Sequence, residues 1–152
     1  DNGQNIMALY DQQLTQSHDL AQMAAARAWS VWEGSCASLR PNHNVMDRFC
    51  EPHTAKSMAL LGAHYFTQSA FLSRNQVLDN MDKVQGLPGV IIHGRYDMVC
   101  PLEQAYLLHH AWPDSELHII REAGHASTEP GMVDAIMRAT DELAKRFNGW
   151  FL

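Results

Sequence analysis

The chain has 152 residues, 46% of them hydrophobic, so it can bury one core of ordinary size but not two independent ones. Its formal net charge of -6 comes with no cluster of lysine or arginine, which argues against nucleic acid and membrane surfaces as partners. No apolar run approaches the roughly twenty residues that a membrane-spanning helix requires, and the polar first residues do not resemble a signal peptide.

Three cysteines, Cys36, Cys50 and Cys100, form no C-x-x-C pair, and their odd number does not suggest a disulfide framework. Free thiols favour a reducing compartment, so we expect a cytoplasmic location. The nine histidines form no H-E-x-x-H or similar ligand spacing. We therefore expect neither a metal nor a cofactor.

Helical patterns occupy the beginning of the chain. A first helix is expected over Ile6–Gln16, and a second from an N-cap at Ser17 to a stop at Gly34. Residues from Leu20 to Val31 recur at i, i+3, i+4 spacing, which favours a helix there.

No period is recognisable over residues 35–50, which we interpret as irregular structure. Pro52 is expected to open a helix that runs toward Phe66, because proline fits the first helical turn. A shorter helical segment around residues 77–81 follows. Modest helices without strands are typical of a cap, so residues 1–86 are interpreted as a partial helical cap.

The pattern changes after a Gly/Pro-rich joint at residues 86–89. Residues 87–152 are expected to alternate strand, helix, strand and helix, with strands over 90–92 and 117–120 and helices from Pro101 and over 132–147. The run at 90–92 is short, continuous and β-branched, as in a strand buried on both faces. The fold class predicted is therefore α/β, with parallel strands and flanking helices.

An acid and a histidine follow the two predicted strands. A strand-helix-strand unit of about thirty residues makes its strands parallel, so Asp97 and His125 should leave the sheet at the same carboxyl edge. Asp114 precedes the second strand and belongs at the opposite edge. An aspartate that accepts a hydrogen bond from imidazole fixes its tautomer and stabilises the imidazolium, which would suit catalysis. The alternative is that Asp97 only caps a turn and that His125 only fills one. The shared edge and the adjacent Gly124 favour catalysis.

Several motifs in the same order resemble the proline iminopeptidase family of α/β-hydrolases. They are WSVWEG at 29–34, HYF at 64–66, HGRYDMVCP at 93–101, AWP at 111–113, and GH at 124–125 followed by EPG at 129–131. The resemblance implies a serine, aspartate and histidine triad in that chain order, with Asp97 and His125 as its last two members. The G-x-S-x-G nucleophile motif is absent, and Ser35 lacks its second glycine. The chain thus resembles only the C-terminal half of the family.

The resemblance also implies that carboxylates of the cap bind the free ammonium group of the substrate. Glu33 matches one of them. A second acidic residue usually precedes the HYF motif, but this chain has Gly62 and Ala63 there. Selectivity for N-terminal proline is therefore in question.

Three functional alternatives follow. The first is a fragment of a serine aminopeptidase that releases N-terminal proline from peptides and is inactive alone, because the nucleophile is absent. The second is a fragment of an esterase, an amidase or a broader aminopeptidase. The third is a truncated, non-catalytic product or binding module. For a half-sheet with an unpaired edge, self-association through that edge is expected.

Overall fold

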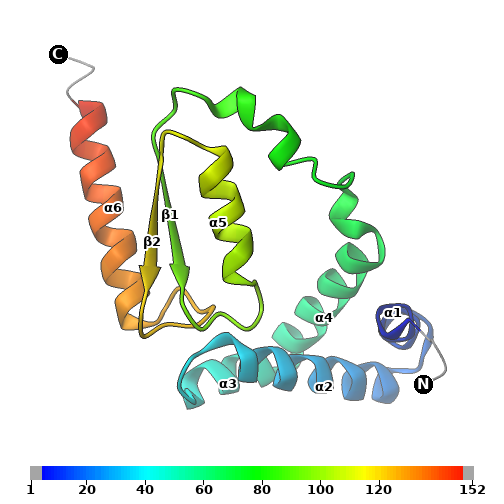
Figure 1. Cartoon of the computed structure of the whole chain (residues 1–152). Helices are drawn as coiled ribbons and strands as arrows, with labels where there is room; N and C mark the ends of the chain where they lie inside the picture. The colour runs from blue at the N-terminus through cyan, green and yellow to red at the C-terminus, as the bar shows by residue number, and fades with distance from the viewer. Residues whose placement is uncertain (1–4, 149–152) are drawn as a thin grey trace. The chain divides into compact units, whose positions relative to one another are not determined.

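The computed structural model describes residues 5–148, which form two compact units. The first unit comprises residues 5–35 and 41–76, and the second comprises residues 36–40 and 77–148. The elements, labelled in Figure 1 where there is room, are α1 Ile6–Gln16, α2 Asp19–Ala37, α3 His43–Cys50, α4 Pro52–Thr67, the 3-10 helices η1 Ser69–Phe71 and η2 Leu78–Val84, β1 Gly89–Gly94, α5 Leu102–Ala111, β2 Ser115–Ile120 and α6 Pro130–Asn148. None of the helices within residues 5–148 combines the length and hydropathy required to cross a membrane.

The core of the first unit is built on Trp29 and on small residues that let helices approach closely. The ring of Tyr10 meets the Trp29 ring edge-on, with 5.2 Å between ring centroids, and the ring of Phe66 stacks on Trp29 with 6.1 Å between centroids. The buried members of this core are Leu14, Ala25, Ala26, Trp29, Ala55, Ala59 and Ala63. The alanines of α4 recur every four residues and so lie on one face of that helix.

The helix predicted from the spacing of residues 20–31 is confirmed as α2, and its buried face differs from the stripe at that spacing. Leu20 is 86% exposed and Val31 is 39% exposed, whereas Ala25, Ala26 and Trp29 are buried. The physical reason is the alanine-rich face of α4, which leaves room for the large indole ring of Trp29 beside the small side chains of Ala25 and Ala26. Packing therefore selected a different stripe of the helix from the one that hydropathy favoured.

Both predicted ends of α2 are wrong. The first helical hydrogen bonds are accepted by the His18 carbonyl, so the helix begins one residue after the position that a Ser17 cap implies. Gly34 does not stop α2, which continues to Ala37. A Cβ at Gly34 would lie 3.3 Å from Phe49 Cβ, so the glycine provides space for α3.

A helix also occupies part of the region predicted to be irregular. The side chain of Asn42 accepts hydrogen bonds from the backbone of Asn44 and Val45 and caps α3. The opening of α4 at Pro52 is confirmed, with Glu51 as its N-cap. Asn42 belonged to a stretch rich in turn-forming residues, which act equally well as helix caps.

In the second unit, β1 and β2 form a parallel pair, as the sequence predicted. The register runs from Gly89 opposite Ser115 to Gly94 opposite Ile120. In Figure 1, α5 and α6 lie on either side of this pair. The residues of β1 between its terminal glycines are only partly buried, in contrast to the burial expected on both faces. Among the described residues the sheet has two strands, which limits how far it can bury them.

The two ends of this sheet differ in chemistry. At the amino end, Asp114 Oδ2 accepts a hydrogen bond of 2.7 Å from the backbone of Gly86. The indole of Trp112 covers Gly89, where a Cβ would overlap the ring. Asp114 therefore has a structural role at the edge opposite Asp97, as the strand order predicted.

Candidate active site

Asp97 and His125 meet beyond the carboxyl ends of the strands. His125 Nδ1 lies 2.9 Å from Asp97 Oδ2. Because an ionised carboxylate can only accept a hydrogen bond, the proton of this pair belongs to Nδ1. The Asp97 side chain is 5% exposed and that of His125 is 42% exposed. The acid is thus enclosed, while the imidazole remains accessible.

Backbone hydrogen bonds between the two turns bring these side chains together. Arg95 donates its N–H to the Ile120 carbonyl at 2.9 Å, which extends the strand pairing by one step. Tyr96 donates to the Ala123 carbonyl at 3.0 Å. Backbone hydrogen bonds therefore fix the turn that carries Asp97 to the turn that leads to His125. The two turns are held together by these bonds as well as by the bond between the two side chains.

Two glycines allow this close approach. A Cβ at Gly94 would overlap the backbone carbonyl of Gly124, which cannot yield as a flexible side chain would. A Cβ at Gly124 would lie 2.9 Å from the backbone nitrogen of Leu39. Both positions therefore require glycine, because the backbones of the two turns and of the segment at Leu39 approach closely there.

The environment of Asp97 stabilises its ionised form. Burial by itself raises the pKa of Asp97, but hydrogen bonds from the Cys100 N–H, the His125 ring and the Val99 N–H outweigh it and lower the pKa overall. His93 adds a longer contact, with Nε2 at 3.7 Å from Asp97 Oδ2. A carboxylate held ionised in this way can orient an imidazole and stabilise its charged form.

The Glu129 carboxylate stabilises the turn that leads to His125. Its Oε2 accepts a hydrogen bond of 2.5 Å from the Gly124 N–H, and Oε1 accepts one of 3.0 Å from the Leu39 N–H. Beside it, the Ala126 N–H donates to the Ala37 carbonyl at 2.7 Å. Two of these hydrogen bonds tie this turn to the segment 36–40, and the third links Gly124 to Glu129 within the turn.

Glu129 was not among the predicted site residues, although it stands in the EPG motif that carried the resemblance. From sequence, a glutamate one residue before a proline is interpreted as part of the beginning of a helix. Its bond to Leu39 joins residues ninety positions apart, which no local pattern reveals.

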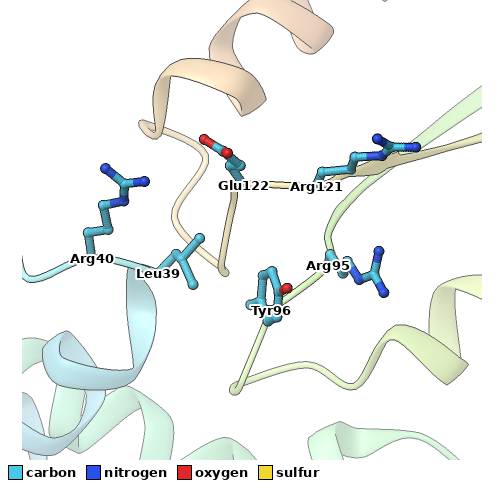
Figure 2. Close-up of a pocket in the computed structure, with 6 residues that line it drawn as sticks. All are labelled: Leu39, Arg40, Arg95, Tyr96, Arg121 and Glu122. Carbon is cyan, nitrogen blue, oxygen red and sulfur yellow. The ribbon is translucent and has the colours of Figure 1, made fainter.

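An open pocket of about 490 Å³ lies in the same unit, shown in Figure 2. Three short segments line it, namely Leu39–Arg40, Arg95–Tyr96 and Arg121–Glu122. Three arginines against one glutamate make this lining positive on a chain whose net charge is negative. Such a surface favours anionic or carbonyl groups of a ligand.

In the first unit, Glu33 is oriented by Trp29. The indole Nε1 donates a hydrogen bond of 2.6 Å to Glu33 Oε2, between residues one helical turn apart on α2. The glutamate is half-buried, so this bond restricts a carboxylate that could otherwise rotate freely in solvent. Glu33 belongs to the first unit, and Asp97 and His125 to the second.

The indole of Trp29 also occupies the space beside Gly62. A Cβ at Gly62 would lie 2.8 Å from Trp29 Cζ2, so the ring covers this position. A side chain at position 62 would therefore meet the Trp29 ring.

Comparison with known proteins extends these observations. A proline iminopeptidase from Xanthomonas citri is 40% identical over 141 residues, covering 92% of this chain and 45% of that protein. The proline iminopeptidase of Arabidopsis thaliana is 35% identical over 144 residues, covering 94% of this chain and 38% of that protein. The chain spans about half the length of the relatives it matches, or less. No family model matches it.

A solved structure gives the fold. An esterase from Exiguobacterium antarcticum aligns with a TM-score of 0.56 over 93% of this chain and 47% of that one, at 18% identity. The parallel strands, flanking helices and this likeness identify part of an α/β-hydrolase fold. Within that class, the sequence matches show that the chain belongs with the proline iminopeptidases.

Proposed function

We propose that Asp97 and His125 are the aspartate and histidine of a serine-hydrolase triad, in an enzyme that releases N-terminal proline from peptides. The observation that carries the proposal is the 2.9 Å hydrogen bond from His125 Nδ1 to Asp97 Oδ2. It leaves Nε2 without a protein partner among residues 5–148, on an accessible ring. That nitrogen is the one that must exchange a proton with a nucleophile.

In the proposed reaction, a serine hydroxyl attacks the peptide carbonyl and passes its proton to His125 Nε2. His125 then gives this proton to the departing amine. Asp97 holds the imidazole in the Nδ1–H tautomer and stabilises the positive charge that forms. Glu129 acts indirectly, by holding the turn that carries His125.

The nucleophile is proposed to come from residues outside these 152, because they contain no G-x-S-x-G motif. The 152-residue chain alone should then be inactive. We further propose that Glu33 binds the substrate ammonium, because Trp29 fixes one carboxylate oxygen and leaves Oε1 without a hydrogen-bond partner in the described part of the chain.

One observation favours a broader aminopeptidase as a second candidate. The indole of Trp29 covers Gly62, so the first unit presents Glu33 without an acidic neighbour at position 62. A single carboxylate can bind an ammonium group, but it imposes less geometry on the substrate than two would. We therefore propose that N-terminal residues other than proline are also accepted.

The test compares prolyl-nitroanilide, alanyl-nitroanilide and a simple nitrophenyl ester as substrates of the complete gene product. Prolyl-nitroanilide turnover that His125→Ala abolishes and His118→Ala preserves would support the proposal. His118 is a suitable control because it is a partly exposed histidine of β2 that pairs with Glu116. Turnover of the ester alone, or full activity in His125→Ala, would overturn it.

Two other expectations remain predictions. Self-association through an outer edge of the strand pair is supported by exposed apolar side chains in the second unit, including Ile119 and Val133. Light scattering of the purified chain should show dimers or larger species, and a monodisperse monomer would contradict this. The cytoplasmic location rests on the three free cysteines.

A further inference from the structure

A thiol joins the Asp97–His125 pair and has no part in the proposed reaction. The carboxylate of Asp97, the Sγ of Cys100 and a ring nitrogen of His125 all lie within 4.8 Å of one another. Cys100 is brought here by the turn that wraps Asp97, in which the Cys100 N–H donates to Asp97 Oδ1 at 2.7 Å. No spacing in the sequence indicated this cluster, because His125 comes from a different turn.

The separations match what a small metal ion needs. Zinc binds sulfur at about 2.3 Å and nitrogen or oxygen at about 2.0–2.2 Å, so neighbouring ligand atoms of a tetrahedral site lie roughly 3.3–3.7 Å apart. The Asp97–His125 distance of 2.9 Å and the 4.8 Å limit for the group bracket that range. Modest side-chain rotations therefore suffice to form the site.

The donor set selects the class of ion. Thiolate and imidazole favour zinc and similar borderline-soft cations, whereas magnesium and calcium prefer oxygen ligands throughout. One sulfur, one nitrogen and one oxygen from protein leave a fourth tetrahedral position for water, as in zinc sites that are open to solvent.

The charge of this cluster, its exposure to solvent and its surrounding hydrogen bonds also suit a bound metal ion. Among residues 5–148, the ion-pair contacts of Asp97 are with His93 and His125, so no lysine or arginine neutralises it. Cys100 and His125 are exposed, which gives an ion a path to enter. His93 Nε2 lies 3.1 Å from the Cys100 carbonyl and so steadies the turn that presents the thiol.

We propose that Asp97, Cys100 and His125 bind one zinc ion, and that the bound ion holds the catalytic pair inactive. The inhibitory consequence rests on the proposed function, but the binding does not. On binding, the Cys100 thiol releases its proton to solvent and sulfur bonds to the metal. The imidazole proton moves from Nδ1 to Nε2 through solvent, so Nδ1 binds zinc and Nε2 can no longer accept a proton.

Cobalt(II) is the probe, because a cobalt–thiolate bond gives a charge-transfer band that histidine and carboxylate ligands do not. The 152-residue chain, reduced and free of metal, is titrated with cobalt and then with zinc. We expect the band to saturate at one cobalt per chain and to be removed by zinc. Cys100→Ser should abolish the band, and His125→Ala should weaken cobalt binding about tenfold or more.

Cys50→Ser and Cys36→Ser are matched controls and should keep the band, since their thiols are not in the cluster. Circular dichroism of each variant establishes that it is folded. Absence of the band in the parent chain, its survival in folded Cys100→Ser, or unchanged affinity in His125→Ala would overturn the proposal. The titration uses no substrate, so its failure is distinct from a failure of the proposed peptidase activity.

Discussion

The backbone N–H of Gly124 donates a hydrogen bond of 2.5 Å to the carboxylate of Glu129. Gly124 immediately precedes His125, and the other oxygen of Glu129 accepts from Leu39 in a distant part of the chain. The position of the imidazole therefore depends on a carboxylate four residues later and on a segment that precedes the sheet.

Glu129→Ala should destabilise the second unit. It leaves two half-buried N–H groups without their acceptor, and the loss of hydrogen bonds to a charged group costs about 2 kcal/mol. Denaturant unfolding measures the change. Glu142→Ala, at an exposed position of α6, is the control and should change stability little. Equal stability of the Glu129 and Glu142 variants would contradict the bracing role.

Gly94→Ala should be more damaging than Gly131→Ala. The new methyl group at position 94 meets the Gly124 carbonyl, so the two turns must separate, at a cost of about 1–3 kcal/mol or more. At position 131 the methyl group approaches only a side-chain atom of Ile120, at 2.8 Å. Thermal unfolding of both variants tests the difference, and a Gly131→Ala variant that is the less stable of the two would refute it.

Asp97 should make stability depend on acid pH. Its folded pKa is lowered, so its contribution is present above the unfolded value of about 3.9 and disappears as pH falls through the lower folded value. Unfolding free energies measured from pH 6 downward should therefore fall more steeply for the parent chain than for Asp97→Asn. Asp141→Asn, at an exposed site on α6, should follow the parent curve. Identical curves for parent and Asp97→Asn would contradict the prediction.

Trp29→Phe should release Glu33. Phenylalanine keeps much of the aromatic packing but cannot donate the 2.6 Å hydrogen bond, so a loss of about 1 kcal/mol is expected. Trp32→Phe, at a 60% exposed position on the same helix, is the matched control. Urea unfolding that shows equal effects for the two substitutions would mean that the Trp29–Glu33 bond contributes nothing measurable.

Much of the second unit could be predicted from sequence because its signals are local. The β-branched run before His93 and the apolar run ending at Ile120 indicated strands, and the helix between them made those strands parallel. That topology was sufficient to place Asp97 and His125 at one edge. The first unit was harder, because Gly34 provides space for α3 instead of ending α2, and because turn-forming residues such as Asn42 also cap helices.

By itself, the sequence determined the order of strands and helices, the shared edge of the acid and the histidine, and the resemblance to proline iminopeptidases. Only the tertiary structure decided that Glu129 reaches Leu39, that Trp29 covers Gly62, and that Cys100 lies beside Asp97 and His125. The physical reason is that periodicity and turn chemistry act over a few residues. Hydrogen bonds and close packing between distant segments exist only once the backbone has brought those segments together.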